Sequence, residues 1–475
     1  MLSLYTGSQG RRCDGVSRRD FIRAGALGFG GLTLPGLLRA RTAAATAGKD
    51  FVKDKSVVLL FLAGGASQYE TIDPKMDMPA EIRSVTGEIT TSVPGITFGS
   101  TFPHLAKIAH KLAIVRSFWG PGGYHEAASV DLLTGGTARP HEMTFGDVGA
   151  SMGSYYSNVA GANHPRTGTP SYSLLIEREL DEFYINYFLK ATRLGSAPGG
   201  LGAAYAAFEP NRASTARENM DLRIPPARFS DRRLLLSSLD KINRRIDQSG
   251  TMEGLDQFHQ QAFDVMRGGA MKALDLSDED PRTIELYDTS LMKIYGHKNP
   301  KQHGPSTIGK LLLMARRLCE AGSGFVTVGS SGWDMHGDIN NLPMVRGMEM
   351  ISPPVDKAIA AFIQDVEQRG LTDKILLVIA GEFGRSPRLN QFAGRDHWIG
   401  SSPLILYGGG LKMGQVIGQS TADGSQPATE PLKPSHLMAT ILNTLFDVGQ
   451  LRLETALPHE LRTAIDTFEP IPHLL

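Results

Sequence analysis

The sequence predicts an α/β fold with a mostly parallel sheet. Three apolar runs have the length of buried strands, and each leads into a polar, glycine-containing loop; they cover 56–62, 325–328 and 375–380. Amphipathic helical patterns over 307–321 and 354–368 precede the second and the third of these runs. Strands that alternate with helices in this way are typical of βαβ units.

Composition excludes several classes of function. The chain has 475 residues, of which 41% are hydrophobic, and it carries 49 basic and 49 acidic residues. This length is sufficient for a large core, and the zero net charge argues against nucleic acid or an anionic membrane as the main partner. Beyond residue 47 the only cysteine is Cys319. We therefore expect no internal disulfide, and the helical apolar spacing around Cys319 predicts a core residue.

The N-terminus has the features of an export signal. The twin-arginine pattern Ser-Arg-Arg-Asp-Phe at 17–21 precedes a glycine-rich apolar run over 24–38 and small residues at 43–47. The apolar run is about fifteen residues long, which is short for a membrane span. We expect 1–47 to be a signal peptide, recognised by the twin-arginine translocase, and 48–475 to be the folded domain. The mature protein would be periplasmic or extracellular, with no stable membrane span.

The first half of the expected domain contains two candidate site segments. The strand over 56–62 ends at a glycine pair, 64–65, which either brings backbone N–H groups close to an anion or simply forms a tight turn. A second buried strand over 112–115 leads through a glycine-rich loop to His125 and a helix over 127–133. At a helix N-terminus His125 would favour a bound anion, and the pKa of its imidazole would be lowered.

Other segments predict structure without indicating function. We expect a surface excursion over 86–98, helices and a strand elsewhere, and Ser435 as the N-cap of the last helix; the helices cover 103–111, 230–246, 255–266 and 434–445, and the strand covers 170–175.

Side chains of the types that bind metals follow the predicted strands over 325–328 and 375–380. Asp334 and His336 are two residues apart in the loop after 325–328, and Glu382 directly follows 375–380. Carboxylates mixed with imidazoles suit zinc or manganese better than calcium, which stays a third candidate. The candidate ligands are Asp334, His336, Glu382, Asp396 and His397.

The same loops carry arginines that can bind an anionic substrate. We expect Arg385 and Arg395 to hold phosphoryl or sulfuryl oxygens in a bidentate fork beside the metal. A metal there would lower the pKa of bound water from about 15.7 to about 7. Structural roles stay open: a loop ion pair between Arg395 and Asp396, a helix cap by Glu382, and purely structural histidines.

These residues resemble the domain-of-unknown-function 1501 family of bacterial proteins with twin-arginine signals. The resemblance covers nearly the whole chain, and the motifs that carry it are 17–21, 62–67, 73–75, 116–117 with His125 and 133–135, 315–318, 332–336, 381–385 and 394–398. That family is similar to the alkaline phosphatase and sulfatase superfamily. The resemblance implies a doubly wound α/β sheet with helices on both faces and a two-metal site.

The superfamily roles transfer only in part. By resemblance, Asp334, His336 and His397 match ligands of one metal, and Glu382 falls where an acidic-histidine pair follows a strand. The superfamily also places a metal-binding aspartate where this chain has Ala63-Gly64. Its nucleophile, nine residues before the Thr134 position, is replaced by His125. The absence of a Cys-x-Pro-x-Arg sequence excludes a formylglycine mechanism.

The function predicted is an exported, metal-dependent hydrolase of phosphate or sulfate esters, with a small-molecule or glycan ester as substrate. His125 is the expected catalytic residue, either as a nucleophile that forms phosphohistidine or as general base or acid for attack by metal-activated water. The alternative is a non-catalytic envelope protein that binds an anion or a glycan and reuses the fold.

Overall fold

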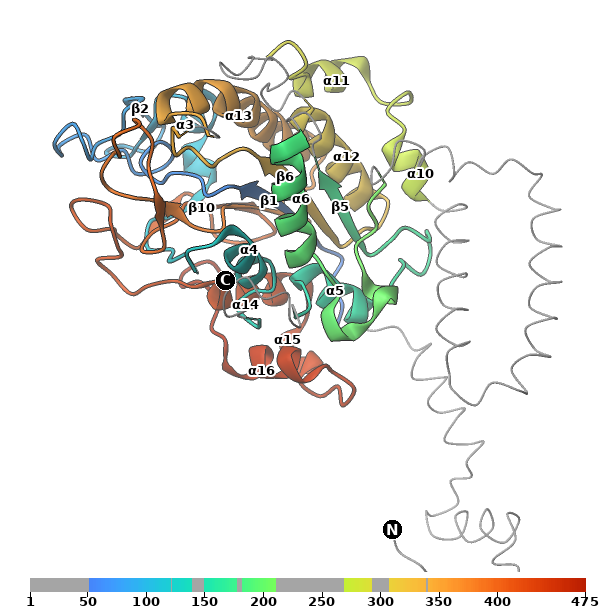
Figure 1. Ribbon diagram of the computed structural model, residues 1–475. Helices are drawn as coiled ribbons and strands as arrows, with labels where there is room; N and C mark the ends of the chain where they lie inside the picture. Colours follow the sequence, from blue (N-terminus) through green and yellow to red (C-terminus); the bar gives the residue numbers. More distant parts are fainter. Residues whose placement is uncertain are drawn as a thin grey trace, which may run out of the picture. The chain divides into compact units, whose positions relative to one another are not determined.

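The computed structural model describes seven stretches of the chain (Figure 1): 51–120, 122–138, 149–176, 182–210, 269–292, 307–338 and 341–475. The predicted signal peptide over 1–47 and the predicted helices over 230–246 and 255–266 lie outside them. Within the described stretches, no helix combines the length and the apolar character that crossing a membrane requires.

A seven-stranded sheet forms the centre of the unit Phe51–Leu475. Its strand order is β11-β4-β10-β7-β1-β6-β5, and β10 alone is antiparallel to its two neighbours. The prediction of a mostly parallel sheet is therefore confirmed. The strands are β1 Ser56–Ala63, β4 Ala113–Val115, β5 Tyr172–Ile176, β6 Phe325–Ser331, β7 Ile375–Ala380, β10 Leu404–Gly408 and β11 Gln415–Ile417.

Helices and two small sheets complete the described residues. The α-helices are α3 Pro103–Lys107, α4 His125–Leu133, α5 Met152–Ala160, α6 Glu182–Gly195, α10 Gly269–Leu274, α11 Pro281–Tyr287, α12 Ile308–Glu320, α13 Met344–Gln368, α14 Pro434–Leu445, α15 Val448–Leu451 and α16 His459–Thr467. Short 3₁₀ turns cover Ala109–Lys111, Gly199–Leu201 and Ala203–Tyr205, and the two-stranded sheets pair β2 Glu88–Thr90 with β3 Thr97–Gly99, and β8 Gly384–Arg385 with β9 His397–Trp398.

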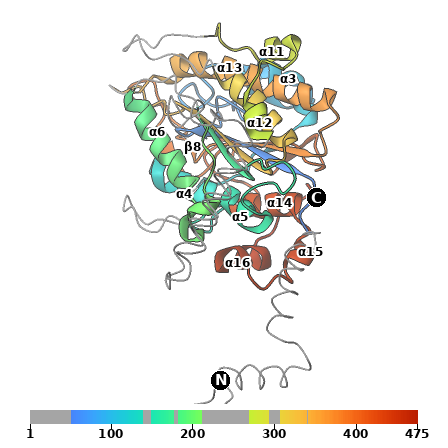
Figure 2. The same ribbon diagram turned by 90° about the vertical axis from the view of Figure 1, so that its right-hand side faces the viewer.

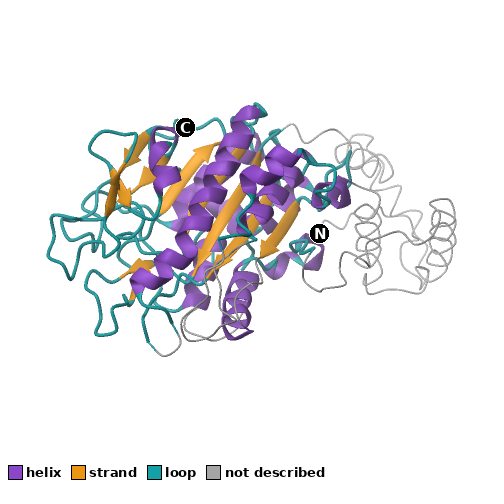
Figure 3. Cartoon of the chain, turned by 90° about the horizontal axis from the view of Figure 1, so that it is seen from above, coloured by secondary structure: helices purple, strands orange, loops and turns teal. Residues whose placement is uncertain are grey.

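Both faces of the sheet are buried. Along β1, Val58 and Leu60 enter one hydrophobic cluster, whereas Val57 and Leu59 enter the other, as the two-residue period of a strand requires. Helices α3, α12 and α13 contribute to the first cluster, and α5, α14 and α16 contribute to the second. Figure 2 shows these two groups of helices on opposite sides of the strands, and Figure 3 shows helices lying across the strands. The predicted doubly wound arrangement is thus confirmed.

Three helix predictions differ from the structure. The helix predicted to begin at Pro354 begins at Met344 and runs through both Pro353 and Pro354. Its buried stripe extends ahead of the prolines, so core packing outweighs their cost. The segment 103–111 divides into α3 and a 3₁₀ turn. The N-cap position of the last helix is held by Lys433 instead of the predicted Ser435.

Cys319 on α12 is buried, as the sequence predicted, and burial raises the pKa of its thiol to about 12. It is therefore an inert core residue at neutral pH.

A buried ion-pair network joins the segment before α11 to α12 and α13. The Glu279 carboxylate accepts hydrogen bonds from Arg316 at 2.7 Å, Arg317 at 2.6 Å and Arg369 at 2.9 Å. Asp365 accepts from Arg316 at 2.8 Å. Burial alone would raise the pKa of Glu279, but the arginine hydrogen bonds and charges lower it to about 2.

We expect Glu279→Gln to lower the free energy of unfolding at pH 7 by about 2–3 kcal/mol. Because the folded-state pKa of Glu279 is depressed from 4.5 to about 2, its contribution is complete above the ordinary pKa and is lost as pH falls through this interval. Urea unfolding would be measured at pH 7, 5, 4 and 3.5. The difference in free energy of unfolding between wild type and variant should stay constant from pH 7 to 5 and shrink from pH 5 to 4 and from pH 4 to 3.5. The exposed Glu454→Gln is the control, and a gap independent of pH would contradict the assignment.

Candidate metal centre

The predicted site residues meet at one edge of the sheet. Gly64, Asp334 and Glu382 follow the carboxyl ends of β1, β6 and β7, and His125 starts α4 after the loop that leaves β4. His397 precedes β10, whose reversed direction brings its amino end to the same edge. Ligands bind beyond the carboxyl ends of parallel strands in open α/β sheets, so this edge is the expected location.

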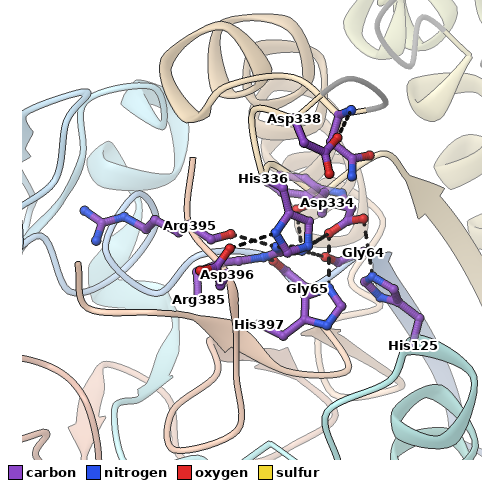
Figure 4. A network of polar contacts seen from close by, with 12 residues as sticks. Gly64, Gly65, His125, Asp334, His336, Asp338, Arg385, Arg395, Asp396 and His397 are labelled. Atoms are coloured by element: carbon purple, nitrogen blue, oxygen red, sulfur yellow. Dashed lines mark hydrogen bonds and ion pairs between the residues drawn. The ribbon is translucent and has the colours of Figure 1, made fainter. Parts of the chain in front are cut away.

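Three histidines direct their Nε2 atoms to the carboxylate of Asp334 (Figure 4). His336 Nε2 lies 2.9 Å from Oδ1, His397 Nε2 lies 3.3 Å from Oδ1, and His125 Nε2 lies 3.4 Å from Oδ2. Candidate ligand atoms of His125, Asp334 and His397 all lie within 4.8 Å of one another. This group can hold a metal ion, with His336 as the neighbouring fourth side chain.

Each of the three rings is also held at its other nitrogen. The acceptors at Nδ1 are Glu382 Oε1 at 2.6 Å for His125, Asp396 Oδ1 at 3.2 Å for His336, and the Gly123 carbonyl at 2.8 Å for His397. Acceptors in this position orient a ring and direct the Nε2 lone pair towards a metal, as in the outer shell of histidine metal sites.

Glu382 was predicted as a metal ligand, but the structure places it outside the group of ligand atoms. Its Oε1 accepts from His125 and from the backbone N–H of Gly64, at 2.8 Å, on the side of His125 away from Asp334. Its Oε2 is buried and makes no hydrogen bond to a described residue. Asp396 likewise contacts the outer nitrogen of His336 and not the inner cluster. Both carboxylates orient histidines.

The sequence predicted either a backbone anion site or a tight turn at the glycine pair after β1, and the structure shows the tight turn. Gly64 has φ +119°, and a Cβ there would lie 2.6 Å from the Asp334 backbone nitrogen. Its N–H is used by Glu382. The turn thus lets the first strand pass directly under the Asp334 loop.

Arg385 lies in the cluster, but its donors are used within the protein. Its guanidinium donates to Asp334 Oδ1 at 2.6 Å, to the carbonyl of Gly65 at 2.8 Å and to that of Arg395 at 3.0 Å, and also to the Gly64 carbonyl. The side chain is fully buried. Arg385 therefore clamps Asp334 and adds a fixed positive charge beside it.

Arg395 does not reach the cluster, contrary to the prediction that it holds an anion. Figure 4 shows its side chain directed away from the three histidines. The guanidinium donates to the Ile82 and Arg83 carbonyls, each at 2.9 Å, forms an ion pair with Glu70 at 3.4 Å, and stacks 4.5 Å from the Tyr69 ring centre. These contacts connect the loop to the segment after β1, which is a structural role.

Electrostatics in the cluster favour an ionised aspartate. Burial would raise the pKa of Asp334, but the Arg385 charge and the histidine hydrogen bonds lower it well below its ordinary value. Burial would lower the pKa of His125, yet the hydrogen bonds with Asp334 and Glu382 raise it to about 9. The lowered pKa predicted from the helix N-terminus is wrong, because two carboxylates outweigh the helix. Burial lowers the pKa of His397.

Asn390, which the sequence analysis did not single out, also connects the two site loops. Asn390 donates to the His336 carbonyl and to Asp396 Oδ1, each at 3.0 Å. Its position in an Asn-Gln-Phe-Ala-Gly turn signals a loop, but its long-range contacts have no signature in the sequence.

Comparison with known proteins identifies the family. Residues 54–452 match the family described as "Protein of unknown function (DUF1501)". The chain belongs to this family. The resemblance predicted from the sequence motifs is thus confirmed, and no curated protein matches the chain.

Several solved structures are similar to the DUF1501 chain at low identity. The lipoteichoic acid synthase LtaP from Listeria monocytogenes is 11% identical over 88% of this chain and 77% of that one, with a TM-score of 0.38. The phosphonate monoester hydrolase SpPMH from Silicibacter pomeroyi is 11% identical over 82% and 73%, with a TM-score of 0.36. The PsFucS1 sulfatase from Pseudoalteromonas sp. is 11% identical over 82% and 68%, with a TM-score of 0.37.

Proposed function

We propose that this protein is a metal-dependent hydrolase of phosphate or sulfate esters. The observation that carries the proposal is the convergence of three imidazole Nε2 atoms on the Asp334 carboxylate, with an acceptor at each outer Nδ1. Such order at both ends of three rings exceeds what surface histidines need, and it is typical of metal sites.

The donor set indicates which metal would bind. Imidazole nitrogens of His125 and His397 with one carboxylate suit zinc or manganese, and calcium fits poorly because it prefers oxygen ligands. When bound, such a metal would supply Lewis acidity and a lowered pKa for a coordinated water. His336 would complete the ligands or contact the substrate.

One metal ion per chain is the expected stoichiometry. At the end of β1, Gly64 offers backbone atoms alone, so that strand supplies no carboxylate for a second ion. The Arg385 guanidinium lies on the Asp334 side chain instead, at 2.6 Å. A fixed guanidinium there would offset negative charge that a second metal would otherwise balance.

The protein's own groups then have defined tasks. Asp334 and the three histidines would bind the metal, and Glu382 would keep the His125 ring in the tautomer that presents Nε2. Both ring nitrogens of His125 face carboxylates, at 2.6 and 3.4 Å. A ligand role fits this geometry better than attack on phosphorus, so we favour water as the nucleophile over phosphohistidine.

One observation favours the non-catalytic alternative, in which the site binds an anion or a glycan without turnover. The donors of Arg385, the predicted anion holder, are used by Asp334 and by backbone carbonyls. A binding protein needs no further donor beyond the metal itself. Turnover therefore has to be measured separately from metal binding.

The compartment is a separate proposal. The twin-arginine pattern at 17–21 supports export to the periplasm or beyond by the twin-arginine translocase, which carries folded chains. A metal bound before export would be retained during such transport.

The proposal is tested by metal analysis together with ester hydrolysis. We expect about one zinc or manganese ion per chain, and hydrolysis of 4-nitrophenyl phosphate or 4-nitrophenyl sulfate that a chelator abolishes and re-added metal restores. Metal without turnover of any ester would favour the binding protein. A protein that takes up no metal after incubation with excess zinc and manganese would overturn both.

A further inference from the structure

Exposed aromatic side chains occur on the segments that carry residues of the candidate metal centre. In the described part of the chain, four aromatic residues are exposed, and all four lie on loops that carry site residues: Trp119 at 36%, Tyr124 at 59%, Phe392 at 52% and Trp398 at 38%. Aromatic side chains cost free energy when they face water, and exposed rings on the segments of a site are available to contact its ligand. Lys433 lies 5.7 Å from the Trp119 ring centre, which leaves the other three for a ligand.

Two of these residues are next to site histidines in the sequence. Tyr124 is the N-cap residue of α4, immediately before His125. Trp398 follows His397 on β9. The Trp398 indole N–H donates to the Ser425 carbonyl at 2.5 Å, and this contact fixes the ring.

Gly400 also holds the indole in place. A Cβ at Gly400 would lie 2.7 Å from Trp398 Nε1, so only glycine allows this approach. Trp398 is thus a preorganised platform whose ring loses little freedom when a ligand covers it.

Phe392 is tied to the third histidine. Asn390 Oδ1 accepts from the N–H groups of Phe392 and Gly394, each at 3.0 Å, which closes the turn. The Asn390 amide donates to the His336 carbonyl at 3.0 Å. The turn therefore presents Phe392 outward at a fixed position relative to His336, and each site histidine has one exposed aromatic ring linked to it.

We propose that Tyr124, Phe392 and Trp398 form a stacking rim for a glycan that carries the anionic ester; this inference rests on the proposed function. A pyranose ring has an apolar C–H face that covers an aromatic ring, while its hydroxyls stay in water. The metal centre would take the sulfate or phosphate group, and the rim would take the sugar rings on either side of it.

The openness of the rim favours several sugar rings over one aryl group. Tyr124 precedes α4, whereas Phe392 and Trp398 belong to the segment between β8 and β10, so the rim combines two separate parts of the chain. Small apolar ligands also prefer enclosed pockets, whereas these side chains are between 38% and 59% exposed. An extended, hydrated chain of sugars matches an open rim of separate platforms.

The test compares polysaccharide binding with turnover of a small ester. Metal-loaded protein would be titrated with chondroitin sulfate, fucoidan and a phosphorylated mannan, each beside its desulfated or dephosphorylated form. We expect Phe392→Ala and Trp398→Ala each to weaken the strongest binding about three- to tenfold. Trp398→Phe should restore most of the loss, and kcat for 4-nitrophenyl esters should not change. Leu453→Ala, which removes an exposed side chain far along the chain at 80% exposure, is the matched control.

The outcomes separate this inference from the proposed function. Small-ester turnover with no binding of any polysaccharide, or with binding that the aromatic variants leave unchanged, would overturn the rim and leave the hydrolase intact. Polysaccharide binding that depends on Phe392 and Trp398 supports the rim even if no ester is hydrolysed. If Trp398→Ala loses its metal, the result for Phe392→Ala decides, because Phe392 is not next to a metal ligand in the sequence.

Discussion

Asp334→Asn is expected to lower the metal content from about one ion per chain to below about 0.1, and to reduce ester hydrolysis at least about a thousandfold. Among the described residues, Asp334 is the side chain that faces all three histidines, at 2.9, 3.3 and 3.4 Å. The neutral amide keeps the shape of the carboxylate but removes the charge that attracts both the metal and Arg385. Elemental analysis and hydrolysis of 4-nitrophenyl esters provide the measurement.

A matched control is available four residues away. Asp338 accepts a hydrogen bond from the Asn341 N–H at 2.9 Å and is not in the cluster. Asp338→Asn should retain metal and activity. Glu382→Gln should be intermediate, with metal affinity lowered about 10- to 100-fold, because Glu382 contacts the outer nitrogen of His125 and the Gly64 N–H and not the inner cluster. An Asp334→Asn protein that keeps its metal would refute the proposed ligand set.

Arg395→Met is expected to lower the free energy of unfolding by about 3–5 kcal/mol, while metal content per folded molecule stays unchanged. The Arg395 side chain is fully buried and holds the Ile82 and Arg83 carbonyls as well as Glu70. Methionine fills a similar volume but leaves Glu70 without its buried cation. Urea unfolding at pH 7, followed by metal analysis of the folded fraction, would measure both effects.

The exposed Arg388 in the same loop provides the comparison. Arg388→Met should change the free energy of unfolding by less than about 0.5 kcal/mol. The role first predicted for Arg395, an anion holder, makes the opposite forecast: a raised KM for the ester with little loss of stability. That pattern would show that the buried geometry of Arg395 does not describe the working enzyme.

The sequence by itself determined the fold class and the location of the site. Apolar runs of strand length and amphipathic helices are local patterns, and they placed β1, β6 and β7 within one or a few residues of their observed ends. Polar residues directly after those strands, such as Asp334 and Glu382, had to lie at one sheet edge, because parallel strands share their carboxyl ends.

Only the tertiary structure decided the role of each site residue. His125 is more than two hundred positions from Asp334 in the sequence, and their contact depends on the order β4-β10-β7-β1-β6, which no local pattern encodes. That order places Glu382 at the outer nitrogen of His125. It also places Arg385 and Arg395, ten positions apart, in different surroundings.

Spacing in the sequence could not distinguish Arg385 from Arg395, because both follow a glycine in the same loop. The fold buries one guanidinium against Asp334 and the other against Glu70. A side chain's function follows from the charges and carbonyls around it. Those neighbours come from distant strands, so the residue types were predictable, whereas their pairings required the packed structure.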